Sequence, residues 1–404
     1  MSTLKVNSIS DSAGANGNAI TLATDGTCTA KITNPPPGNR NKIINGAMRV
    51  AQRATSKTGA GGGDGYWIAD RWRLFSSGAA RFTVTRPNTS SGTQPGFPNS
   101  YKFECTTADT SVAAGEYLGF QQILEGQDVQ DFLKGTSSAK EFTLSFYVKT
   151  NKSGVYTVEL NDHDNTRQIS KTFTVSDGNW NRYTVTFPAD TTGVFDNDNA
   201  NSLQVNFWLI AGTNYTSGTL NSSAWAAKTN ANRVSSSNVN IGDSTSNTLE
   251  ITGVQLEVGG TATDFEHRSY ADELRRCYRY CQMDHSSRSG DNYHWFAQGF
   301  SGGLNYAFFV IDIPEPMRVT PSLVEAGIDA GSSSSDGNGM KIDHRTTSGL
   351  SVYAISSAEI YASSTPERVL VYVSHTSSGT QGCNAGLVSY NNQTSYLLLE
   401  AELT

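Results

Sequence analysis

Apolar and polar residues alternate with a period of two along much of this chain. Between residues 142 and 149, Phe142, Leu144 and Phe146 are separated by threonine, serine and tyrosine, which is the pattern of a strand with one buried face. Comparable runs occur at 155–160, 173–175, 183–187, 203–210 and 248–258. Because two one-sided sheets must bury their apolar faces against each other, this pattern predicts an antiparallel jelly-roll sandwich over residues 41–268.

Strand patterns resume in the last third of the chain. They occur at 293–300, 304–313, 351–355, 359–362, 368–374 and 395–403, and they predict a smaller antiparallel β domain over residues 285–404. A Gly- and Ser-rich run at 331–339 predicts an exposed, flexible loop inside this domain. The predicted fold class is therefore all-β.

One short helix is expected between these two regions, within residues 269–284. Ser269 precedes Asp272 by three positions, a variant of the capping box, and the period then changes to about 3.6 from Ala271 to Met283. The apolar stripe of this helix consists of Leu274, Cys277, Tyr278 and Cys281. A stripe this narrow is typical of helix packing, and we expect it to form the interface of a homotrimer.

Residues 1–40 have a different character. Short apolar alternations are separated by Gly- and Asn-rich turns, and the segment ends in the triplet Pro35, Pro36 and Pro37. A region this small cannot bury a core of its own, and the prolines favour a stiff spacer. We interpret it as an attachment segment that orders against a partner or its own copies, with a frayed terminus as the alternative.

Charge and composition exclude several classes of partner. The chain has 30 Lys and Arg against 37 Asp and Glu, with a net charge of −7, so no basic stripe is available for nucleic acid. No apolar run is long enough for membrane insertion, and no secretory signal precedes the first strand. The five cysteines are scattered and odd in number, which favours free, buried thiols over a disulfide framework.

Few residues form a pattern that indicates catalysis or a cofactor. Structural calcium is the single metal considered, at the oxygen-rich runs 161–165 and 196–199, although both also fit polar hairpin loops. The helix thiols lack the further ligands of a closed zinc site. No catalytic residues are assigned and an enzyme is not expected, but five acids in or near strands leave glycoside hydrolysis open, namely Glu104, Glu116, Glu125, Glu159 and Asp162.

Aromatic residues are the more informative class, because their rings combine apolar faces with polar rims that can stack on sugars. Trp72 and Trp208 occupy strand positions and are expected in the core. Trp225 lies in a long polar loop, and Tyr293, His294 and Trp295 begin a C-terminal strand. These last four are the candidate ligand-binding residues.

Four segments carry a resemblance to tail fibre or related virion fibre proteins of marine and cyanobacterial phages. They are residues 41–53 (NKIINGAMRVAQR) with 70–73 (DRWR), residues 253–259 (GVQLEVG) with 262–270 (ATDFEHRSY), the helix 273–280 (ELRRCYRY), and the N-terminal MSTLKV. Members often have proline where this chain has Asp264. The residues after 285 match only loosely.

This resemblance implies a virion protein with a jelly roll like that of carbohydrate-binding modules. It implies that residues 1–40 attach to other virion proteins, that the chain forms a homotrimer, and that the β domain at 285–404 is a receptor-facing tip. We therefore expect adhesion to a host surface polysaccharide or receptor, strengthened by multivalency. The alternative is a purely structural virion component, such as a capsid fibre or tail adaptor, without receptor binding.

Overall fold

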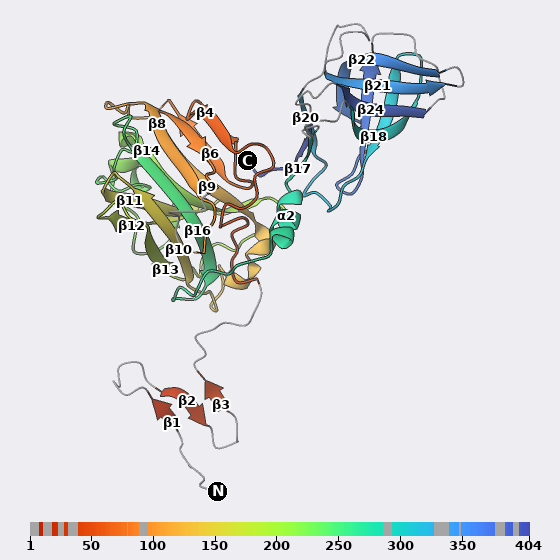
Figure 1. The fold of residues 1–404 in the computed structure, drawn as a ribbon. Coiled ribbons are helices and arrows are strands. Elements are labelled where there is room, and N and C mark those ends of the chain that lie inside the picture. The colour runs from red at the N-terminus through yellow and green to blue at the C-terminus, as the bar shows by residue number, and fades with distance from the viewer. Residues whose placement is uncertain are drawn as a thin grey trace.

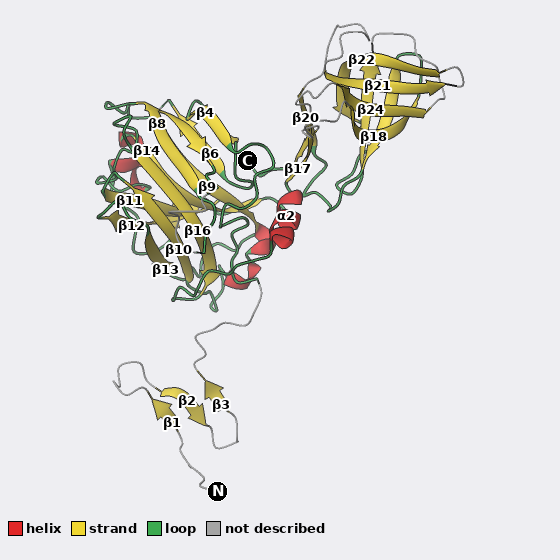
Figure 2. Ribbon diagram, viewed as in Figure 1, coloured by secondary structure: helices red, strands yellow, loops and turns green. Residues whose placement is uncertain are grey.

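The fold is almost entirely antiparallel β structure, as the sequence predicted (Figures 1 and 2). The computed structural model describes residues 8–10, 18–22, 28–30, 39–78, 80–88, 96–285, 293–326, 339–346, 349–375, 384–390 and 396–404. The predicted loop at 331–339 lies outside these ranges except for its last residue. No helix in the described ranges is long and apolar enough to cross a bilayer.

Two facing sheets form the large sandwich. The six-stranded sheet has the order β13 (Asn181–Phe187), β10 (Phe142–Thr150), β16 (Thr248–Val258), β8 (Tyr101–Thr107), β7 (Arg81–Thr85) and β4 (Ser56–Ala60). The seven-stranded sheet has the order β15 (Ala226–Ala227), β12 (Arg167–Val175), β11 (Gly154–Asp162), β14 (Asn201–Ala211), β9 (Tyr117–Glu125), β6 (Arg73–Ser77) and β5 (Gly65–Tyr66). Their inner faces interdigitate to form the main core.

The alternating residues of β10 show why the sheets pack in this way. Phe146 is fully buried, and its ring centroid lies 5.0 Å from that of Phe207 on the opposite sheet. Tyr101 and Phe120 make a second contact between the sheets, at 4.5 Å. Each such side chain contributes roughly 1.5–3 kcal/mol through burial. The expected core position of Trp72 is confirmed, because it is fully buried and stacks on Phe120.

The long polar segment 211–247 covers part of the sandwich. It contains α1 (Thr213–Thr216), β15 and the 3-10 helix η3 (Asn230–Asn232). Two further 3-10 helices, η1 (Gly126–Asp128) and η2 (Gln130–Phe132), follow β9. Val234 and Ile241 are fully buried, so this segment is anchored by a few apolar residues in spite of its composition.

Helix α2 (Tyr270–Tyr278) follows the sandwich. The predicted cap is confirmed, because the Ser269 hydroxyl accepts a hydrogen bond from the backbone N–H of Asp272 at 3.1 Å. The helix ends at Tyr278, whereas the sequence predicted Met283. The reason is long-range pairing: residues 281–285 form strand β17 (Cys281–His285), which pairs with β25 (Tyr396–Glu400) near the end of the chain.

Strand β25 also pairs with β20 (Ser322–Ala326), and the resulting three-stranded sheet lies between the sandwich and the barrel (Figure 1). The last four residues then return to the sandwich. Glu402 forms ion pairs with Arg53, at 3.1 Å, and with the fully buried Arg71. The Tyr66 hydroxyl donates to the carbonyl of Leu403 at 2.6 Å. We call residues 401–404 the C-terminal clasp.

A closed six-stranded barrel forms the remainder of the C-terminal part. Its strands are β18 (Tyr293–Ser301), β19 (Tyr306–Ile311), β23 (Val369–His375), β22 (Gly349–Ile360), β21 (Gly339–Thr346) and β24 (Asn384–Tyr390), in that order around the barrel. Where the sequence predicted two strands, at 351–355 and 359–362, there is a single strand, β22, with an irregularity between Ile355 and Ser357. Strand β21 was not predicted, since charged residues dilute its apolar alternation.

At the N-terminus, β1 (Ser8–Ser10), β2 (Asn18–Leu22) and β3 (Cys28–Ala30) form a small antiparallel sheet. These strands lie within the predicted attachment segment. The role of that segment stays a prediction.

Candidate functional site

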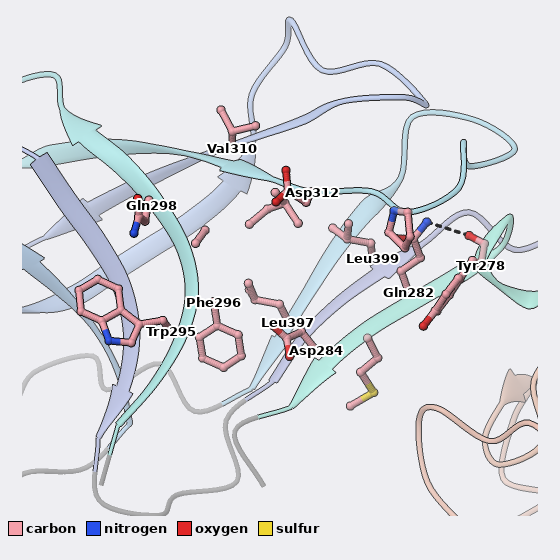
Figure 3. A pocket seen from close by; sticks show the side chains of 14 residues that line it. Tyr278, Gln282, Asp284, Trp295, Phe296, Gln298, Val310, Asp312, Leu397 and Leu399 are labelled. Carbon is pink, nitrogen blue, oxygen red and sulfur yellow. Dashed lines mark hydrogen bonds between the residues drawn. The ribbon is translucent and has the colours of Figure 1, made fainter. Parts of the chain in front are cut away.

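We call the three-stranded sheet of β17, β25 and β20 the junction sheet. A cleft of about 680 Å³ lies where the junction sheet meets the outer face of the barrel. Its walls come from the end of α2, from β17 and β25, and from barrel strands β18 and β19 (Figure 3). Trp295 and Phe296 supply aromatic surface, and Asp284, Gln298 and Asp312 supply polar groups. The cleft therefore combines a large apolar ring with carboxylates and an amide, which is a composition suited to a polyhydroxylated ligand.

Trp295 is the most exposed aromatic side chain of this cleft, at 46%. The pairing of β18 with β24 is irregular between Trp295 and Ala297, and such a bulge redirects side chains. The indole lies against Gly386 of β24, where a Cβ atom would come within 2.0 Å of the ring. Glycine at this position therefore lets the ring rest on the sheet, and the backbone supports it from beneath.

His294 connects the barrel to the junction sheet. Its Nε2 atom lies 3.1 Å from Oδ1 of Asp284 on β17, and its ring lies 4.7 Å from that of Phe296. His294 therefore holds one wall of the cleft in place. It is a positioning residue and does not present a free imidazole to the cleft.

The remaining polar residues differ in availability. Gln282 donates to the backbone carbonyl of Tyr278 at 3.1 Å (Figure 3). It also donates to the backbone carbonyl of Glu315 at 2.9 Å. Within the described residues, no hydrogen bond engages the side chains of Gln298 and Asp312, which are both exposed. These two side chains are therefore free to bind a ligand.

No family model and no curated protein matches this chain. Among solved structures, TmCBM61 in complex with β-1,4-galactotriose is 11% identical, covers 54% of this chain and 99% of its own, and has a TM-score of 0.27. A family 11 carbohydrate-binding module from Clostridium thermocellum is 14% identical, with 53% and 99% covered and a TM-score of 0.24. A cyclase from Fischerella sp. is 14% identical, with 55% and 98% covered and a TM-score of 0.29.

Binding modules and a cyclase thus have comparable similarity to this chain. One architecture hosts many activities. TM-scores this low carry no argument about function, which has to come from the side chains of the cleft.

The structure places the four predicted ligand-binding residues in different environments. Trp295 is exposed as expected and lines the cleft, and His294 lies beside it. Tyr293 begins β18, and its side chain lies outside those described. The expectation for Trp225 was wrong: it is 6% exposed, and its Nε1 donates to the carbonyl of Pro188 at 2.9 Å. The two residues after it, 226–227, extend the seven-stranded sheet as β15, which places the indole in the core.

The structure contradicts the predicted trimer interface for two of its four residues. Cys277 and Cys281 are both fully buried within the chain. Cys277 packs in a cluster with Ile44, Val50, Ile123, Tyr280 and Leu403. Leu274 packs against the same cluster, and Tyr278 lines the cleft. Leu274 and Cys277 of the apolar stripe thus face the sandwich and the C-terminal clasp of their own chain. Burial raises the pKa of both thiols well above the usual value, as for inert structural cysteines.

The acidic candidates in the sandwich are occupied by internal partners. Glu159 is fully buried and accepts from Arg233 at 2.8 Å and from Trp208 at 3.0 Å. Asp162, at the oxygen-rich turn considered for calcium, is fully buried and paired with Lys134. The ammonium group of Lys134 thus occupies the position beside the Asp162 carboxylate that a metal ion would take. Within the described residues, no three His, Cys, Asp or Glu side chains could hold a metal ion together.

Sequence reasoning missed Gln298 and Asp312. Both occupy polar positions in an alternating strand pattern, where nothing distinguishes a residue in a cleft from one in open solvent. Only the packing of β17 and β25 beside β18 and β19 makes the difference.

Proposed function

We propose that this chain is a non-catalytic attachment protein of a phage particle and that it binds a surface glycan in the cleft at Trp295. One observation carries the binding part of this proposal. An exposed indole, backed by Gly386, shares a cleft with the unengaged side chains of Gln298 and Asp312. Sugars present apolar C–H faces that stack on such a ring and hydroxyl groups that bind carboxylates and amides.

The virion context is supported by the resemblance of residues 1–280 to phage fibre proteins. In that context residues 1–40 attach the chain to other virion proteins, and the barrel with its cleft is directed toward the host. A homotrimer belongs to the same proposal, but its interface has to lie elsewhere than on the buried stripe of α2. Three copies would strengthen weak single-site binding, because later contacts are effectively intramolecular.

The test compares the affinity of the wild-type chain for glycans with that of the Trp295→Ala variant. The probe is a panel of purified neutral and bacterial surface polysaccharides in affinity gel electrophoresis, followed by calorimetry with each polysaccharide that retards the chain. We expect loss of the indole to weaken binding by about tenfold or more. Tyr270→Ala is the matched control, since Tyr270 is an exposed aromatic residue at the far end of α2, outside the cleft.

If no polysaccharide in the panel retards the wild-type chain, glycan binding fails and the purely structural virion component becomes the better interpretation. If Trp295→Ala binds as well as the wild type does, the cleft is not the site.

A second candidate function rests on Asp284 and Asp312, because two carboxyl groups in one cleft are the minimum that glycoside hydrolysis requires. Release of reducing ends from a bound polysaccharide would favour it, provided that Asp312→Asn abolishes the release. Asp284 is partly engaged by His294, which favours binding over hydrolysis.

A further inference from the structure

The outer face of the barrel carries a second group of aromatic residues, of which two are exposed and three are half-buried. We call it the aromatic band; it consists of Phe300 on β18, Tyr306 and Phe308 on β19, Tyr372 on β23, and Tyr361 just after β22. Phe300 is 53% exposed and Tyr361 is 42% exposed, at the two ends of the group. Clustered exposed apolar side chains on a folded protein indicate a binding surface more often than isolated ones do.

Strand register explains how these rings meet. Phe300 pairs with Phe308 across β18 and β19, and Phe308 pairs with Tyr372 across β19 and β23. The ring centroids are 5.4 Å apart in the first pair and 5.5 Å apart in the second. Tyr361 lies 5.1 Å from Phe308, and Tyr306 lies 5.4 Å from Tyr372. Each ring is thus held by its neighbours, so the surface is ordered before any ligand binds.

The band is continuous with the cleft. Gln298 and Val310 line the cleft, and each lies two residues along its strand from a member of the Phe300–Phe308 pair. Side chains two residues apart lie on the same face of a strand, about 7 Å apart. The cleft and the band therefore share the outer face of β18 and β19.

The charges around the band limit what it can bind. Glu359 pairs with Tyr372, and Ser357 pairs with Ser374, in the adjoining positions of β22 and β23. The paired positions named here include one carboxylate, hydroxyl groups and aromatic rings, but no basic residue. Exposed Glu367 and Arg368 lie in the turn that follows Tyr361, so the band has no strong charge of one sign, and its rings and hydroxyl groups fit a neutral, polyhydroxylated chain.

We propose that the aromatic band continues the cleft, so that the ligand is an extended stretch of polysaccharide, running from Trp295 past Gln298 and Val310 onto Phe300 and Phe308. This inference deepens the proposed function and rests on it. It identifies the ligand as the interior of a polymer several sugars long. A ligand that used the cleft alone could be a single terminal sugar.

The experiment measures affinity against ligand length. The probe is a series from disaccharide to octasaccharide, made by partial hydrolysis of the polysaccharide that retards the wild-type chain. We expect wild-type affinity to rise along the series. Phe300→Ala combined with Tyr361→Ala should weaken octasaccharide binding by about tenfold and leave disaccharide binding unchanged, whereas Trp295→Ala should weaken both. Tyr270→Ala again serves as the control.

Three results would overturn the inference. Equal affinity for the disaccharide and the octasaccharide would mean that the cleft binds a short ligand, and the proposed function would survive. Unchanged octasaccharide binding by the double variant would remove the band from the site. If the double variant instead abolishes a concentration-dependent self-association seen by sedimentation, the band contacts a second copy. Because Phe300 and Tyr361 are exposed at the ends of the band, the double variant should fold, and near-ultraviolet circular dichroism checks this.

Discussion

Replacing Glu402 by glutamine should loosen the C-terminal clasp and destabilise the junction between the sandwich and the barrel. The Glu402 carboxylate is almost fully buried and forms ion pairs with Arg53 and Arg71. Arg71 is fully buried, and its guanidinium carbon lies 3.4 Å from the centroid of the Tyr280 ring. The variant keeps the shape of the side chain but leaves a buried guanidinium group without its carboxylate.

The expected loss follows from the contacts that remain. Removing one partner of a buried ion pair typically costs about 3–5 kcal/mol. Arg71 still donates to the carbonyl of Ile123 at 2.6 Å, and Arg53 still pairs with Glu400 at 2.8 Å. The lower end of that range, about 3 kcal/mol, is therefore expected, which is roughly a hundredfold in the unfolding equilibrium.

Urea denaturation followed by tryptophan fluorescence measures this loss, provided that the slope of the transition is unchanged. Glu400→Gln is the matched control. Glu400 belongs to the same cluster but its side chain is 30% exposed, so we expect a loss of less than about 1 kcal/mol. Equal effects of the two substitutions would refute the assignment of Arg71 and Glu402 as the principal pair of the clasp.

Three further outcomes are expected. Burial raises the pKa of Glu125, but hydrogen bonds from Arg279 and Tyr280 outweigh it and hold the pKa below its usual value. The stability this confers is present above about pH 4 and is lost as the pH falls through the lowered pKa. In Glu125→Gln, the free energy of unfolding measured in urea should therefore depend less on pH in the acid range than it does in the wild type. EDTA should leave the melting temperature unchanged, because Lys134 occupies the carboxylate of Asp162; a drop reversed by calcium would contradict this. Cys277 should react with a thiol reagent only when the chain unfolds, and rapid labelling in the native state would show that the site opens.

Much of the fold could be predicted from local pattern. The alternation of Phe142, Leu144 and Phe146 predicted a half-buried strand, because a strand turns successive side chains to opposite faces. Ser269 and Asp272 predicted the start of a helix, because a cap satisfies backbone N–H groups within one turn. These features depend on neighbours in the sequence, and the sequence alone determined them.

The tertiary structure decided what each face meets. The helix stripe that contains Cys277 was recognisable as apolar, but Leu403, which packs in the same cluster, lies more than a hundred positions further along the chain. Trp225 looked exposed because its loop is polar, and pairing of the next two residues with β12 buried it.

The binding cleft has the same origin. Trp295 could be selected from the sequence as an aromatic residue worth testing, but Gln298 and Asp312 could not. They become part of a site because β25 brings the junction sheet beside β18 and β19. The sequence by itself determined most of the strands and the start of the helix, and it singled out Trp295. Pairing between distant strands, which local periodicity does not encode, determined the cleft around that ring.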